Sequence, residues 1–161
     1  MVKKNKVWEL LDQISDPEIP VLTIRDLGIL RDVEITEEKV VVTITPTYSG
    51  CPAMTTIEDD ISALFIKEGI QDFDINLVLS PAWTTDWMSE EGRVKLREYG
   101  IAPPENEIDK SVLFAEPPVI SCPKCNSEDT RMVSQFGSTA CKAHYQCNKC
   151  LEPFDYFKCL K

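Results

Sequence analysis

Two Cys-x-x-Cys pairs near the C-terminal end constrain this chain more than any other feature. They are Cys122-Pro123-Lys124-Cys125 and Cys147-Asn148-Lys149-Cys150. Two residues between paired cysteines allow a tight turn to aim both sulfurs at one ion, and two such turns complete the tetrahedral shell that zinc prefers. We therefore predict a zinc ribbon over residues 120–161, with a structural zinc ion held by Cys122, Cys125, Cys147 and Cys150.

The ligand set also limits what this ion can do. Four thiolates leave no open coordination position, so the ion is expected to support the fold rather than catalysis. An iron–sulfur cluster on the same ligands is the chemical alternative. Cys141 and Cys159 keep it open, because they lie close in sequence to the second pair. They could be additional ligands, a redox pair or small buried side chains. His144 is the single histidine and is interpreted as a strand residue.

Composition excludes several classes of partner. The chain has 27 acidic and 17 basic residues, a net charge of -10, whereas binding to phosphates needs a basic surface. No apolar run approaches the roughly 18 residues of a membrane span, and acidic residues interrupt the apolar N-terminal segment that a signal peptide would require. Paired cysteines that bind metal are typical of a reducing compartment. We predict a cytoplasmic protein with neither nucleic-acid nor membrane partners.

The N-terminal part, residues 1–100, has the periodicities of a small α+β domain. Residues 29–35 and 39–45 predict a hairpin, and alternating apolar residues from Phe73 to Leu79 predict a third strand. Apolar residues at helical spacing predict helices over 6–14 and 89–99, and between them a helix after Cys51 that ends at Gly69. That helix starts either at Pro52 or at a capping box made by Thr55 and Glu58.

A proline-rich stretch separates the two parts. Residues 101–119 lack a sustained period and are predicted to be a linker. Beyond them, short β-prone runs predict three strands of the ribbon at 130–136, 143–147 and 154–158.

One cysteine outside the ribbon is a candidate functional thiol. Cys51 lies between Gly50 and Pro52 at the start of the second predicted helix. Unpaired N–H groups and the positive end of the helix dipole are expected to lower the pKa of a thiol there. A capping or buried cysteine is the alternative. The sequence places no general base beside Cys51, so a Cys–His hydrolase has little support.

Two further groups of residues are open to more than one interpretation. Asp16, Glu18 and Asp26 cluster in the loop after the first helix, where acids cap helices, face water, hold a hard metal or position the thiol. Trp83 and Trp87 are spaced to share one helical face. They are interpreted either as core residues or as anchors for a partner.

Together these motifs carry a family resemblance. Asp16-Pro17-Glu18-Ile19-Pro20, Asp26-Leu27-Gly28-Ile29 and Gly50-Cys51-Pro52 resemble the signature of SufT-like iron–sulfur maturation proteins over about residues 6–100. Three longer motifs are Ser80 to Met88, Phe136 to Lys142 and Glu152 to Cys159. They resemble the D-subunit family of the bacterial phenylacetyl-CoA ring-epoxidase (phenylacetate-CoA oxygenase) system. The resemblance implies a two-layer α/β domain of the SufT-like type followed by a zinc ribbon.

The resemblance also implies a role. It predicts an accessory protein of phenylacetate degradation that acts beside a di-iron oxygenase and its iron–sulfur reductase, in metal-centre maturation rather than turnover. In the wider family the cysteine that matches Cys51 is the functional thiol, and the acidic motif that matches Asp16 and Glu18 lies near it.

The leading hypothesis is a non-catalytic maturation subunit in which Cys51 transiently binds iron or a cluster and Asp16, Glu18 and Asp26 shape its loop. A homodimer or a ligand from the client would then complete the metal's shell. A tethering subunit without metal transfer is the second hypothesis, and an enzyme with Cys51 as nucleophile is the third.

Overall fold

The computed structural model describes residues 2–104 and 119–158, which form two compact units. The first unit extends to Gly92 and the second begins at Arg93. Most of the predicted linker, residues 105–118, lies outside the described residues. Among the described helices, none has the length and apolar character needed to cross a membrane.

The first unit is built on a three-stranded sheet in the order β1-β2-β3. Strands β1 (Leu30–Ile35) and β2 (Val40–Ile44) form the predicted antiparallel hairpin. Strand β3 (Phe73–Leu77) runs parallel to β2, so the chain must cross over between them, and helix α2 (Ala53–Lys67) makes that crossover. Helix α1 (Lys4–Leu11) packs against β1.

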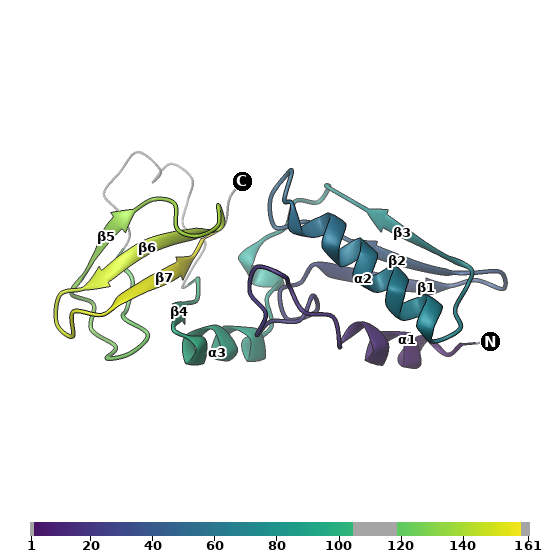
Figure 1. Cartoon of the computed structure of the whole chain (residues 1–161), viewed down its shortest axis with the longest axis horizontal. Coiled ribbons are helices and arrows are strands. Elements are labelled where there is room, and N and C mark those ends of the chain that lie inside the picture. The colour runs from purple at the N-terminus through teal and green to yellow at the C-terminus, as the bar shows by residue number, and fades with distance from the viewer. Residues whose placement is uncertain (1, 105–118, 159–161) are drawn as a thin grey trace. The chain divides into compact units, whose positions relative to one another are not determined.

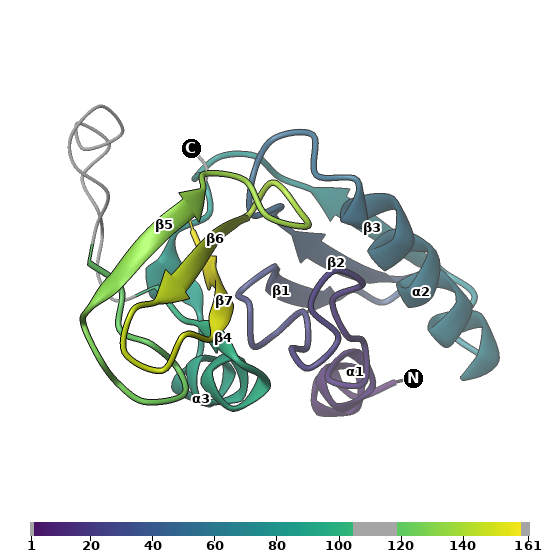
Figure 2. The same cartoon turned by 60° about the vertical axis from the view of Figure 1, so that its left-hand side comes forward.

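Helix α2 covers one face of this sheet, as Figures 1 and 2 show from two sides. Its buried stripe contains Ile57, Ile61 and Phe65, each fully shielded from solvent. Burial of each such side chain contributes about 1.5–3 kcal/mol. The ring of Phe65 meets Phe73 of β3 edge to face, with the centroids 5.2 Å apart. The unit is therefore a two-layer α/β arrangement, as the sequence predicted.

The two ends of α2 follow from local chemistry. The helix begins at Ala53 directly after Pro52, so the alternative start at a Thr55–Glu58 capping box is wrong. The proline ring already restricts φ to a helical value there. At the other end Gly69 has a φ of +79°, and the N–H of Ile70 donates to the carbonyl of Phe65 at 2.8 Å. This is a Schellman ending, in which glycine avoids the strain of the left-handed region.

The chain passes between the units through a 3-10 turn, η1 (Thr85–Trp87), and helix α3 (Glu90–Tyr99). The division between units falls within α3, earlier than the predicted boundary at residue 100. Contacts of the later part explain the difference. Arg93 donates to the carbonyl of Pro104, and Arg97 donates to Asn126 Oδ1 at 3.1 Å.

The second unit is a four-stranded sheet in the order β4-β7-β6-β5. The three predicted ribbon strands are present as β5 (Thr130–Ser134), β6 (Lys142–Cys147) and β7 (Pro153–Phe157), paired antiparallel. Strand β4 (Ile101–Ala102) was assigned to the linker from the sequence, but it pairs in parallel with β7. A two-residue strand has no readable period, and only pairing with a distant partner reveals it. The core of the unit combines two of the paired cysteines with aromatic side chains, namely Cys122, Cys147, Tyr145, Phe154 and Tyr156.

Candidate metal centre and the Cys51 loop

The two Cys-x-x-Cys turns have the same backbone construction. The N–H of Cys122 donates to the carbonyl of Ser127 at 2.9 Å, and the N–H of Cys147 donates to the carbonyl of Glu152 at 3.0 Å. The residue after the second cysteine of each pair has a positive φ, +60° at Asn126 and +65° at Leu151. Each turn thus folds the chain back sharply and directs its two sulfurs to the same side.

The four sulfurs gather in one place, all within 4.8 Å of one another. The Sγ atoms of Cys122 and Cys150 are 3.7 Å apart, and those of Cys125 and Cys147 are 3.6 Å apart. A zinc ion with bonds of about 2.3 Å to four sulfurs gives a tetrahedral edge of about 3.8 Å. The donor set and its spacing therefore fit a structural zinc ion, and all four predicted ligands are brought together.

Crowding of the thiols shows why a cation belongs there. The backbone N–H of Cys150 lowers the pKa of Cys147 to about 7. The N–H of Glu152 acts in the same direction on Cys150, but burial and the neighbouring sulfurs raise the pKa of that thiol to about 12. Four thiolates cannot share this volume without a positive charge to offset their repulsion.

The other ribbon residues singled out from the sequence lie apart from this cluster. Cys141 is buried, with its Sγ 3.1 Å from Thr139 Oγ1, so it is a small buried side chain rather than an exposed thiol. His144 lies in β6 as predicted, with Nδ1 3.3 Å from Asp155 Oδ1 of β7. Cys159 lies outside the described residues.

Cys51 lies just before α2, half-buried in the loop that leaves β2. The predicted fall in the pKa of Cys51 is wrong, because burial raises that pKa and outweighs the other influences. The backbone N–H of Ala53 lowers it, which is the expected effect of the helix start, and so does the side chain of Tyr48. Tyr48 was given no role from the sequence, although its place three residues before Cys51 in one turn was visible.

The acidic loop approaches Cys51 through two of its three carboxylates. The negative charges of Glu18 and Asp16 both raise the pKa of the Cys51 thiol. Asp16 is buried, and its Oδ1 accepts the N–H groups of Glu18 and Ile19, each at 2.8 Å. Asp16 therefore shapes the turn that carries Glu18. The side chain of Glu18 remains partly exposed.

Asp26, the third acid of this loop, holds the loop in place through hydrogen bonds. Its Oδ2 accepts the N–H of Thr23 at 3.2 Å, and its Oδ1 accepts the hydroxyl of Ser89 at 3.0 Å. Trp83 is buried, and its Nε1 donates to the carbonyl of Leu27 at 2.7 Å. These bonds connect the acidic loop to the segment of Trp83 and Ser89. Sequence reasoning missed Ser89, because nothing local distinguishes it from other polar residues before a helix.

The two tryptophans differ in environment. Trp83 is a core residue, which was one of the two interpretations. Trp87 is only partly buried, and the guanidinium of Arg31 stacks over its ring at 3.5 Å from the centroid. Gly28 lies against the backbone of Trp87, where an added Cβ would come within 2.4 Å of the carbonyl oxygen. Gly28 therefore allows the close approach of this segment to the acidic loop.

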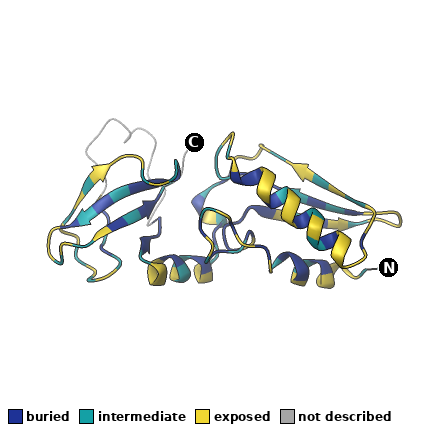
Figure 3. Cartoon of the chain, in the orientation of Figure 1, coloured by how far each residue is buried: buried dark blue, intermediate teal, exposed yellow. Residues whose placement is uncertain are grey.

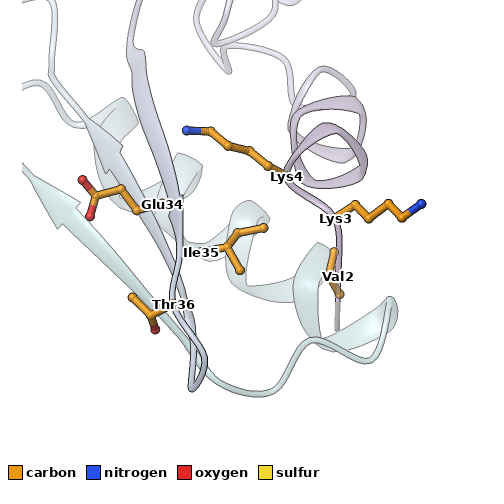
Figure 4. Close-up of a pocket in the computed structure, with 6 residues that line it drawn as sticks. All are labelled: Val2, Lys3, Lys4, Glu34, Ile35 and Thr36. Atoms are coloured by element: carbon orange, nitrogen blue, oxygen red, sulfur yellow. The ribbon is translucent and has the colours of Figure 1, made fainter.

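An open hollow lies between the start of α1 and the end of β1 (Figure 4). Val2 and Ile35 give it an apolar side, and the remaining lining residues are Lys3, Lys4, Glu34 and Thr36. Lys4 forms an ion pair with Asp32 at 3.6 Å. The residues that line this hollow include neither a thiol nor a histidine.

Two protein families match the chain. Residues 4–67 match the family described as iron–sulfur cluster assembly protein, and residues 106–158 match the PaaD zinc beta ribbon domain. The first region includes the acidic loop and Cys51, and the second includes the four clustered cysteines. A zinc ribbon therefore follows a domain of the iron–sulfur assembly type.

Individual relatives agree with this division. A protein of Escherichia coli K12 named as the D subunit of 1,2-phenylacetyl-CoA epoxidase is 51% identical over 97% of this chain and 93% of its own length. An iron–sulfur protein maturation auxiliary factor of Bacillus subtilis is 34% identical over 58% of this chain and 92% of its own. The crystal structure of a DUF59 domain from Bacillus anthracis is 29% identical and superposes with a TM-score of 0.54 over 58% of this chain and 90% of that one.

Proposed function

The chain belongs to the D-subunit family of 1,2-phenylacetyl-CoA epoxidase, and we propose that it is an accessory subunit without catalytic activity of its own that assists assembly of an iron or iron–sulfur centre. The clients would be the components of the phenylacetyl-CoA oxygenase system, its di-iron oxygenase and its iron–sulfur reductase. The match of residues 4–67 to iron–sulfur cluster assembly proteins supports this assignment. The reducing cytoplasm is the compartment in which such thiols stay available.

The observation that carries the proposal is that Cys51 lies within electrostatic reach of two carboxylates of the acidic loop. Glu18 and Asp16 act on the thiol, so a cation held by Cys51 would lie within the field of two carboxylates. Iron accepts both thiolate and carboxylate ligands. Cys51 would be the thiolate ligand and Glu18 the carboxylate ligand, while Asp16 and Asp26 keep the loop in shape.

The raised pKa of Cys51 fits transfer rather than storage. A protonated thiol must release its proton to solvent when it takes up metal, so protons compete with the metal at neutral pH. A site with few ligands and a half-buried thiol would hold its cargo weakly. Ligands of the client, or those of a second copy of this chain, would complete the shell.

The zinc ribbon has a separate part in this scheme. Four cysteine ligands complete the coordination shell of the zinc ion and leave no open position. The ribbon would therefore act as a rigid surface that docks the client. Tethering of the oxygenase components without metal transfer is the second candidate function. In that case Cys51 would stay a protonated thiol, and its raised pKa would have no part in binding a cargo.

A deletion strain complemented with variants separates the two functions. The oxygenase and its reductase would be purified from a strain that lacks this chain, and iron and acid-labile sulfide measured in each. We expect at least one component to be deficient, and the wild-type chain to restore its metal whereas Cys51→Ser does not. Full restoration by Cys51→Ser would leave tethering as the function.

A further inference from the structure

Strand β3 forms an exposed, largely apolar edge of the first sheet. Its side chains are mostly exposed or half-exposed, as the colours of Figure 3 show. Leu77 is 46% exposed, and Leu79, two residues beyond the strand, is 56% exposed. Phe73, Ile75, Leu77 and Leu79 alternate along the chain and so belong to the face that α2 covers only in part. An apolar strip of this kind at a sheet edge is prone to pairing with another strand.

The opposite edge of the same sheet is protected. Strand β1 has three charged residues, Arg31, Asp32 and Glu34, and its register is irregular between Leu30 and Asp32. Charges and bulges are the usual means by which edge strands avoid association. From Phe73 to Leu79 the single charged residue is Asp74, and it forms an ion pair with Lys39 of the same chain. The β3 edge therefore lacks the protection that β1 has.

The backbone of β3 is oriented for pairing. The N–H of Val78 donates to Ile44 at 2.9 Å, and the carbonyl of Asp72 accepts the N–H of Val40 at 3.0 Å. The even-numbered residues therefore direct their N–H and C=O groups toward β2. Because these groups alternate along a strand, those of Ile75 and Leu77 point away from β2 toward the open edge.

We propose that β3 is the contact surface between two copies of this chain, which pair their β3 strands antiparallel about a two-fold axis at Asn76. This register pairs Ile75 with Leu77 of the partner copy and Phe73 with Leu79. It also places Asp74 opposite Val78, so like charges do not meet, and sets the two Asn76 amides side by side. Of the symmetric registers that the backbone allows, this one pairs all four apolar residues of the face that α2 partly covers. A C₂ contact requires such self-complementarity.

The sequence of the edge favours a second copy over an unrelated strand. A foreign strand would need its own matching pattern of apolar residues. A second copy of the segment from Phe73 to Leu79, running antiparallel, already has that pattern. Each copy has a net charge of -10, so the copies repel each other over the Debye length and association should strengthen as salt rises. Pairing through β3 requires nothing of Cys51, and it is tested without any measurement of metal transfer.

Sedimentation equilibrium of the zinc-loaded full chain provides the first test. We expect a reversible monomer–dimer equilibrium whose association constant rises between about 0.05 and about 0.5 M salt. Leu77→Lys should weaken the dimer about tenfold or more, because the substitution enters a two-fold interface twice. Val133→Lys is the matched control, since Val133 is a similarly exposed apolar residue on another edge strand, at 53% exposure. A wild-type chain that stays monomeric, or equal effects of the two substitutions, would overturn the proposal.

Disulfide trapping tests the register. Residues that face each other in a pair without mutual hydrogen bonds have Cα atoms about 4.5 Å apart, within the range of a disulfide. Asn76→Cys should therefore form a covalent dimer under mild oxidation, beyond the background from the native thiols. Asp74→Cys points to the same face, but it lies opposite Val78 of the second copy. The two introduced cysteines would then be about 14 Å apart along the strand, so they should not cross-link. Equal cross-linking of both variants would refute this register, and a monomeric wild type with no trapped dimer would assign the edge to another chain or leave it unpaired.

Discussion

Ser89 and Asp26 are joined by two hydrogen bonds across a wide separation in sequence. The hydroxyl of Ser89 donates to Asp26 Oδ1 at 3.0 Å, and the N–H of Ser89 donates to the carbonyl of Asp26 at 2.9 Å. Asp26 is buried, and its other oxygen accepts the N–H of Thr23. The carboxylate thus holds the loop by accepting hydrogen bonds from both sides of it.

Asp26→Ala should destabilise the first unit. Removal of the carboxylate leaves the N–H of Thr23 and the hydroxyl of Ser89 without this acceptor, and hydrogen bonds to charged groups contribute about 1.5–3 kcal/mol. We expect a loss of about 2–3 kcal/mol in the free energy of unfolding, measured by urea denaturation with tryptophan fluorescence. Ser89→Ala removes the hydroxyl that donates to Asp26 and accepts the N–H of Gly92 at 2.9 Å, so it should cost a comparable amount, about 2 kcal/mol. Unchanged stability with reduced iron binding would make Asp26 a ligand instead.

Zinc removal should unfold the ribbon and spare the first unit. Purified protein should hold about one zinc ion per chain, and Cys147→Ser should release it, because the tetrahedral shell needs all four sulfurs. All three tryptophans lie before residue 93, so the ribbon is best followed through the near-ultraviolet circular dichroism of Tyr145 and Tyr156. Tryptophan fluorescence should not change.

Cys141→Ser is the control for that experiment, since Cys141 is buried but lies outside the sulfur cluster. It should keep the zinc. Iron and acid-labile sulfide in the wild-type ribbon, in place of zinc, would contradict the structural-zinc assignment.

Local patterns predicted most of this fold. The hairpin β1–β2 follows from β-branched alternation, the end of α2 from Gly69, and the zinc cluster from cysteine spacing, because each depends on residues close in sequence. Strand β4 was missed, since Ile101 and Ala102 become a strand only through pairing with β7.

The sequence did not predict the raised pKa of Cys51, for a related reason. Proximity to a helix start can be read from the sequence, and that influence is present. The burial of the thiol and its closeness to Glu18 and Asp16 arise from tertiary structure. These long-range influences outweigh the local one and reverse the sign of the shift.

Leu151→Asn should stabilise the zinc-loaded ribbon. Leu151 is 69% exposed, so it buries little, yet its φ is +65°. That conformation brings Cβ close to the following carbonyl oxygen and costs about 1–2 kcal/mol, whereas asparagine adopts it more readily. We expect a gain of about 1 kcal/mol, seen as a higher midpoint of thermal unfolding. Val133→Asn replaces another exposed apolar residue and should show no gain, so equal shifts in both variants would point to surface polarity rather than backbone strain.

Glu18→Gln should activate the Cys51 thiol. The negative charge of Glu18 raises the pKa of Cys51, so its removal should lower that pKa and increase the rate of alkylation at pH 8. In the wild type Cys51 should react more slowly at this pH than an unperturbed thiol, since less of it is thiolate. Mass spectrometry of the peptide that contains Cys51, after timed alkylation over a series of pH values, measures both rates.

Glu9→Gln is the matched control, because Glu9 is an exposed acid of α1 that is not among the influences on the pKa of Cys51.

The raised pKa of Cys51 has a consequence for stability. A thiol whose pKa is raised by folding binds its proton more tightly in the folded state, so its contribution is complete below the unfolded pKa and is lost as pH rises through the folded value. The wild-type domain should therefore lose stability above about pH 9 more steeply than Cys51→Ser does. Equal alkaline slopes in the two proteins would show that Cys51 has an ordinary pKa, and would remove the basis for a weakly held, proton-linked cargo.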